Sequence, residues 1–156
     1  MAVAQQSPAL DSVATRANLA TRAAAGLVLI ACGSFLAVAA GLDPSPTGAG
    51  THCQLGLAPC GFLEQAGMPC ATCGMTTAVA LAADGRLLDA ARVQPAGATL
   101  AVVAAVVALL AAWSLLSGMA LAPVWGALWN LRTFIAASAL VLGAWLYKIA
   151  VYHGMF

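Results

Sequence analysis

The sequence predicts an all-α fold: an integral membrane helical bundle of about three transmembrane helices, with a short half-helix and an interfacial amphipathic helix between the first two. Three observations predict it. Of the 156 residues, 63% are apolar and 7% are charged, whereas a soluble domain carries about 25% charged residues. The apolar residues form long continuous runs without alternation, which favours helices over a membrane barrel. The apolar part is rich in alanine, a small residue that lets helices pack closely in lipid.

Three segments are apolar over about 20 residues each, which is the length that a membrane-spanning helix needs. We expect spans at about 23–42, 96–117 and 131–152, within one membrane domain covering 23–152. A flexible tail at 1–22 precedes this domain, a cysteine-rich loop at 43–95 joins the first two spans, and a short tail at 153–156 follows. Pro44 ends the first span and Pro95 suits the first turn of the second.

The first span also carries two patterns typical of processing sites, the box at 29–32 that ends in Cys32 and the small residues at 37–39. Its apolar run is longer than a signal-peptide core and continues through Cys32, which favours a retained helix. Cleavage remains the alternative. In a retained helix, Cys32 would act as a small buried apolar residue.

Several shorter features qualify this outline. Residues 74–83 predict a helix too short to cross a bilayer, and residues 86–93 place leucines and charges on opposite sides, as an interfacial helix does. Trp125 and Trp129 are typical of a membrane-interface belt. Lys148 lies in the last turns of the third span, so we expect its side chain to extend to the headgroups.

Charge excludes some classes of function. The net charge is +1 and no basic run is present, so we expect no nucleic-acid partner. None of the five acidic residues lies in a predicted span, which argues against a conventional pump or transporter. Positive charges divide evenly between the two sides of the membrane. Since the first helix usually sets orientation, we expect the N-terminus inside and the cysteine loop outside.

The loop contains four clustered cysteines, the feature with the most chemical content. Cys70 and Cys73 form a CxxC pair, the smallest unit that presents two thiolates to one tetrahedral ion. Cys53 and Cys60 would complete a four-sulfur site for zinc or another thiolate-bound metal, and His52 could replace one of them. Prolines precede Cys60 and Cys70 directly and stiffen the chain before each sulfur.

Two other interpretations of the loop stay open. In a redox site, Cys70 would attack and Cys73 would resolve, because the start of the following helix stabilises a thiolate. A thioredoxin-like context for such a pair is absent from the sequence. If the loop faces an oxidising compartment, its four cysteines could instead form two structural disulfides in one of three connectivities.

The sequence around the CxxC pair resembles the domain of unknown function 2752 family, small bacterial membrane proteins with a Cys-Pro-x-Cys-Gly-x-Thr-Arg signature. The resemblance rests on residues 68–78, on 84–91 and on Gln94-Pro95, which precedes the second span. Three positions depart from the family pattern: Ala71 replaces a proline, Thr77 an arginine and Gln94 an asparagine. The resemblance implies a multi-spanning protein of the bacterial cytoplasmic (inner) membrane in which the CxxC pair matters, and it supplies no reaction.

From these features we expect a non-enzymatic membrane protein whose cysteine loop is fixed by metal or disulfides. Its expected role is that of an accessory or assembly component, with the lipid bilayer and other membrane subunits as partners. The alternative is an enzyme, a membrane thiol–disulfide oxidoreductase that uses Cys70 and Cys73.

Overall fold

Three long helices form the frame of the protein in the computed structural model, which describes residues 19–119, 126 and 130–154. They are α2 (Leu19–Ala40), α6 (Pro95–Ser117) and α8 (Leu131–Tyr152), each long and apolar enough to cross a membrane. The all-α prediction is confirmed: the described residues contain helices and no strand. Helix α2 begins at Leu19, inside the segment predicted as tail, while the bounds of α8 coincide with the predicted span. The predicted tryptophan belt, Trp125 and Trp129, lies outside the described residues.

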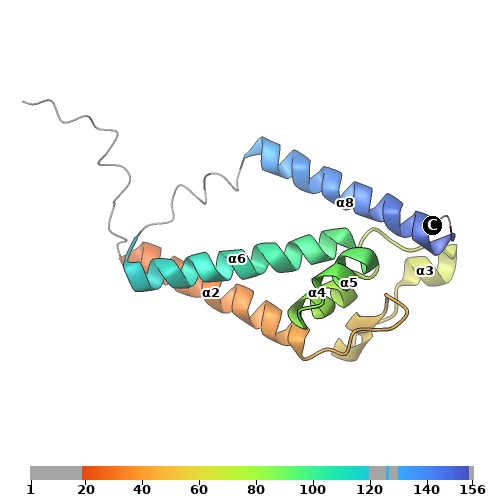
Figure 1. Ribbon diagram of the computed structural model, residues 1–156, viewed down its shortest axis with the longest axis horizontal. Helices are drawn as coiled ribbons and strands as arrows, with labels where there is room; N and C mark the ends of the chain where they lie inside the picture. The colour runs from red at the N-terminus through yellow and green to blue at the C-terminus, as the bar shows by residue number, and fades with distance from the viewer. Residues whose placement is uncertain (1–18, 120–125, 127–129, 155–156) are drawn as a thin grey trace, which may run out of the picture.

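Helices α2 and α6 pack side by side in opposite directions (Figure 1). At the end of the pair where α2 begins and α6 ends, the Arg22 side chain donates a hydrogen bond to the Leu115 carbonyl oxygen at 3.2 Å. The buried side chains along these two helices are almost all alanines: Ala25, Ala39, Ala96, Ala98, Ala101, Ala104 and Ala111. Small side chains allow the close approach on which helix association in lipid depends.

Large apolar side chains point away from the protein instead of filling its interior. Leu27 on α2, Leu116 on α6 and Phe134 on α8 are 69%, 85% and 73% exposed. A soluble protein rarely exposes so much contiguous apolar surface to water, whereas lipid tails solvate such a surface. The three helices therefore indicate a membrane protein.

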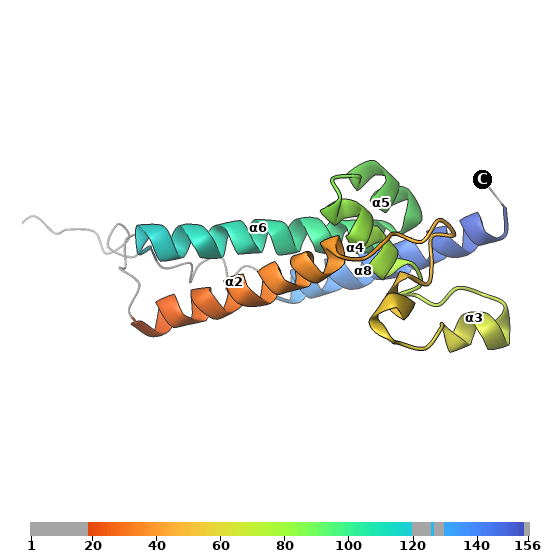
Figure 2. The ribbon, with the colours of Figure 1, turned by 90° about the horizontal axis from the view of Figure 1, so that it is seen from below.

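Four short helices fold between α2 and α6 at one end of the frame (Figure 2). They are the 3-10 helix η1 (Thr51–Leu55), α3 (Gly61–Ala66), α4 (Met75–Ala83) and α5 (Leu87–Val93). The two helices predicted at 74–83 and 86–93 are thus present as α4 and α5. The sequence did not predict η1 or α3.

Helix α4 is packed inside the bundle, in contact with α2, α5 and α6. Its residues 77–81 are all buried. At its crossing with α6, a Cβ on Gly97 would lie 2.9 Å from both the Ala78 Cβ and the Met75 carbonyl oxygen. Glycine at position 97 is therefore what allows the two helix backbones to approach each other.

Helix α5 has the amphipathic character that its sequence predicts. Asp89 pairs with Arg86 at 2.9 Å and with Arg92 at 3.3 Å on the exposed side, while Ala90 is fully buried against α4 and α6. Leu88 is 76% exposed. A helix with ion pairs beside exposed leucine suits the membrane–water interface.

Candidate functional site: a three-cysteine cluster

Three cysteine side chains meet where the loop folds back on itself. The Sγ atoms of Cys60, Cys70 and Cys73 all lie within 4.8 Å of one another. Two thiolates bound tetrahedrally to one zinc ion at about 2.3 Å would be about 3.8 Å apart. The cluster is therefore close to the geometry that a single thiolate-bound metal ion requires.

Local turns bring these sulfurs together. Cys60 is the N-cap residue of α3, and Gly67 ends that helix in the left-handed conformation, with φ +65°, so that the chain reverses toward Cys70. The Cys73 backbone N–H donates to the Cys70 carbonyl oxygen at 3.0 Å, which closes the CxxC segment into a tight turn before α4. Glycine adopts this left-handed conformation at little cost.

Cys60 and Cys73 differ in their surroundings. Cys73 is 6% exposed, and burial, with the nearby Cys60 and Cys70, raises its pKa to about 11. Cys60 lies nearer solvent, and hydrogen bonding to the backbone N–H of Leu63 lowers its pKa. Without a metal ion, Cys73 remains a neutral thiol at physiological pH. A metal ion would reverse this preference, because a coordinating thiol is deprotonated.

Cys53, the fourth predicted ligand, lies apart from the other three. Its side chain is exposed, and its Sγ is 3.9 Å from Nε2 of the neighbouring His52. The His52 Nε2 is also 3.1 Å from the Ala58 carbonyl oxygen. The structure therefore brings together three of the four cysteines predicted as metal ligands, including both members of the predicted redox pair.

Helix α8 holds the loop from the other side through three side chains. Trp145 Nε1 donates to the Pro69 carbonyl oxygen at 3.0 Å, directly before Cys70, and the Tyr147 hydroxyl donates to the Arg92 carbonyl oxygen at 3.0 Å. Lys148 Nζ donates to the carbonyl oxygens of Gly48 at 3.1 Å and Val93 at 3.2 Å. These bonds fix the loop to the last turns of α8.

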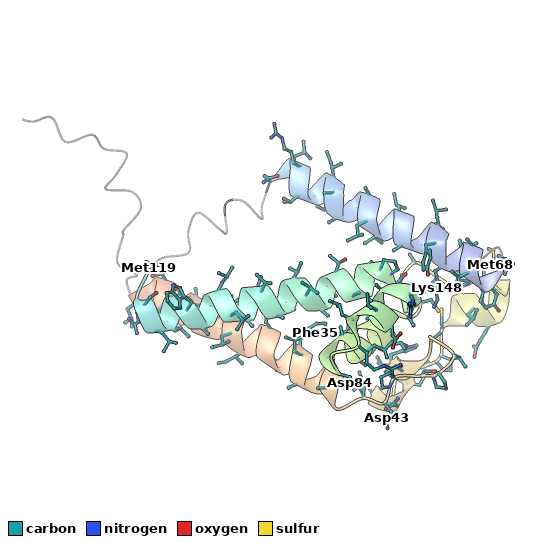
Figure 3. All side chains as sticks on the ribbon, viewed as in Figure 1. Phe35, Asp43, Met68, Asp84, Met119 and Lys148 are labelled. Atoms are coloured by element: carbon teal, nitrogen blue, oxygen red, sulfur yellow. The ribbon has the colours of Figure 1, made fainter. Side chains whose placement is uncertain are left out.

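The position of Lys148 corrects the prediction from sequence. Its side chain is 9% exposed and lies between α8 and the loop, as labelled in Figure 3, instead of extending to the headgroups. The two carbonyl acceptors lie 100 and 55 residues away from Lys148 in the chain. The prediction was wrong because the sequence near Lys148 does not show that the fold brings these acceptors to it. Within the described residues, the ion pairs join Asp89 to its two arginines, and Lys148 has no carboxylate partner.

Buried polar contacts also fix the CxxC turn from within the loop. Gln94 is fully buried, and its Nε2 donates to the Ala71 carbonyl oxygen at 3.0 Å. The hydroxyls of Thr51 and Thr77 share a buried hydrogen bond of 2.8 Å. Sequence reasoning did not assign these roles to Gln94 and Thr77, although both are positions where the chain departs from the family pattern.

Gly74 is the tightest point of this assembly. Its φ is +85°, and a Cβ there would lie 2.5 Å from the Gly48 carbonyl oxygen and 3.1 Å from Lys148 Nζ. A side chain at position 74 would displace the carbonyl that Lys148 binds. Only glycine fits between Cys73 and α4.

An apolar groove of about 730 Å³ runs beside the cluster, between the C-terminal half of α2, α4 and the loop. The apolar walls are supplied by Phe35 and Val38 of α2, by Leu42 just after that helix, and by Val79 of α4. His52 and all three clustered cysteines line the same groove, whereas Cys53 does not. No Asp, Glu, Lys or Arg is among its lining residues.

Comparison with known proteins relates part of the chain to a protein family. No curated protein and no solved structure matches the chain. Residues 60–108 match a family model described as "Protein of unknown function (DUF2752)". This segment contains the three clustered cysteines, α4, α5 and the first part of α6. The resemblance that the cysteine motif predicted is confirmed as a match to this family model over residues 60–108.

Proposed function

We propose that this protein is an accessory or assembly component of a membrane system, in which Cys60, Cys70 and Cys73 bind one thiophilic metal ion. The observation that carries the proposal is the approach of the three sulfurs to within 4.8 Å of one another. Soft thiolate ligands in a tetrahedral arrangement favour zinc. The proposed location is the outer face of the bacterial cytoplasmic membrane.

The number of cysteines supports a metal over a disulfide alone. A disulfide between any two members of the cluster would leave the third as a free thiol beside it, whereas one metal ion uses all three. Metal binding would also cross-link two segments, because Cys60 begins α3 and the other two cysteines form the turn before α4. Such a link fixes an otherwise irregular loop.

The buried Lys148 ammonium gives independent support. A buried charge is costly unless an opposite charge compensates it, and no carboxylate in the described part of the chain does so. Three thiolates around a divalent ion carry a net charge of −1. Lys148 Nζ lies 3.1 Å from the site of a Cβ on Gly74, the residue after Cys73, so the ammonium would offset this charge.

The surroundings of the cluster support the proposed accessory role. The groove beside it contains no carboxylate that would act as a general acid or base. The loop is instead held rigidly by hydrogen bonds from α8 and from Gln94. A rigid, metal-fixed loop at the membrane edge is a suitable contact surface for another membrane subunit.

Metal content of cysteine variants tests the proposal. The protein is purified in mild detergent from zinc-supplemented cells, and its metal stoichiometry is measured by intact mass spectrometry and elemental analysis. We expect one metal ion per chain, lost in Cys60→Ser, Cys70→Ser and Cys73→Ser. Cys32→Ser and Cys53→Ser are the matched controls and should keep the ion. A wild-type chain that neither carries nor rebinds metal would contradict the proposal.

A second candidate function is thiol–disulfide exchange, which the difference in burial within the CxxC pair favours. Cys70 is half-buried and Cys73 is buried, as expected for an attacking and a resolving cysteine. The Cys70 thiolate would attack a substrate disulfide and release one substrate thiol. Cys73 would then displace the second substrate thiol, leaving the Cys70–Cys73 disulfide.

Trapping distinguishes the two candidates. With an exchanger, Cys73→Ser accumulates a mixed disulfide between Cys70 and a cellular partner, because the resolving thiol is absent. With a metal site, the same variant loses metal and traps no partner. Cys53→Ser is the control in both cases, since Cys53 lies outside the cluster.

A further inference from the structure

Three sulfurs leave a tetrahedral metal ion one ligand short. Structural zinc sites are almost always four-coordinate, with Cys₄, Cys₃His and Cys₂His₂ as the usual ligand sets. The loop contains one histidine and one further cysteine that could supply the missing ligand, the neighbours His52 and Cys53 on η1. The positions of the two side chains and the charge of the resulting centre decide which of them completes the site. This inference rests on the proposed metal function.

Position favours His52. Its side chain lines the groove that the three clustered cysteines also line. The Cys53 side chain is exposed and does not line this groove. The His52 ring also lies 3.1 Å from the carbonyl oxygen of Ala58, two residues before Cys60. The His52 ring nitrogens are not among the ligand atoms that lie within 4.8 Å of one another. Metal binding therefore requires the ring to rotate into the groove and to exchange this hydrogen bond for a bond to the metal.

Charge favours the same residue. With neutral imidazole as fourth ligand, a divalent ion and three thiolates carry −1, which the Lys148 ammonium balances. With Cys53 as fourth thiolate, the centre carries −2 and one charge is left uncompensated. Lys148 lies beside Gly74, outside the groove, and none of the described residues that line the groove is Lys or Arg. A neutral assembly is the less costly one at the edge of the hydrocarbon.

We infer that His52, and not Cys53, is the fourth ligand, so that the loop forms a Cys₃His centre from His52, Cys60, Cys70 and Cys73. The single nitrogen ligand makes this centre distinguishable by spectroscopy from a four-sulfur site. The adjacent positions of His52 and Cys53 also provide a matched pair of variants on the same turn of η1.

Cobalt(II) is the probe, because it occupies zinc sites and its absorption bands report coordination. Reduced, metal-free protein in detergent is titrated with Co²⁺ for the wild-type chain, His52→Ala and Cys53→Ala. We expect His52→Ala to lower Co²⁺ affinity by at least about 10–100-fold, since loss of a residue that only hydrogen-bonds to a metal ligand already costs that much. Cys53→Ala should match the wild type. X-ray absorption of the wild-type zinc form should show three sulfurs and one nitrogen.

Added imidazole separates ligation from a general effect on folding. It should restore the wild-type cobalt spectrum in His52→Ala by occupying the vacated ligand position, which it would not do for a misfolded loop. Co²⁺ binding that is unchanged in His52→Ala, or lost in Cys53→Ala, would overturn the inference and leave the three-cysteine site standing. A wild-type chain that binds no Co²⁺ would overturn the proposed function and this inference together.

Discussion

Substitution of Gly74 by alanine tests how the loop is held against α8. Position 74 combines two demands on the chain, a left-handed backbone with φ +85° and a closest approach of 2.5 Å between a new Cβ and the Gly48 carbonyl oxygen. The left-handed conformation alone costs an alanine about 1–2 kcal/mol. Displacement of the Gly48 carbonyl would also weaken its hydrogen bond with Lys148, and a bond to a charged group contributes about 1.5–3 kcal/mol. We therefore expect Gly74→Ala to lower the free energy of unfolding by about 2.5–5 kcal/mol.

Gly85→Ala is the matched control. Gly85 also has a positive φ, +79°, but nothing lies within 4 Å of a Cβ built there. It should cost only the conformational part, about 1–2 kcal/mol, and the change in unfolded-state entropy is shared by both variants. Unfolding of the detergent-solubilised protein by SDS, followed by far-UV circular dichroism, gives both values. If the two variants differ by less than about 0.5 kcal/mol, the contact between Gly74, Gly48 and Lys148 does not hold the loop as described, since each term above exceeds that amount.

Two further predictions concern helix packing and thiol reactivity. Gly97→Ala should destabilise the protein by about 1–3 kcal/mol through overpacking at the α4–α6 crossing. Gly143→Ala is the control and should be neutral or slightly stabilising, because nothing lies within 4 Å of a Cβ built there. Equal effects of the two substitutions in the same SDS unfolding assay would contradict the close crossing. In the reduced, metal-free protein, the lowered pKa of Cys60 and the pKa of about 11 for Cys73 mean that Cys60 reacts as a thiolate at lower pH. Iodoacetamide labelling followed by peptide mass spectrometry should show Cys60 modified before Cys73 as pH rises, and the reverse order would refute this assignment.

The helical frame could be predicted from the sequence because its signals are local. Continuous apolar runs give the spans, Pro95 is found at the first turn of α6, and α4 begins directly after Gly74. Each signal depends only on the residues beside it. The same is true of α5, where the spacing of its charges and leucines already indicates an amphipathic helix.

The site itself could be predicted only in part. The sequence identified the cysteines as candidates, yet it could not separate Cys60 from Cys53, because that choice depends on the turn at Gly67 and on the path of α3. Nor could it place Lys148, whose acceptors are backbone carbonyls with no sequence signature. Carbonyl groups look alike in every residue, so only the fold shows which of them meet a distant ammonium.

Thiol proximity in the membrane tests the central claim most directly, since the proposed metal site depends on Cys60 lying beside the CxxC pair. Reduced, metal-stripped protein in native membranes is treated with a short bifunctional thiol reagent, and the linked peptides are identified by mass spectrometry. We expect links that join Cys60 to Cys70 or Cys73, with Cys53 modified singly. Links from Cys53 to the pair, with Cys60 left out, would contradict the three-cysteine cluster.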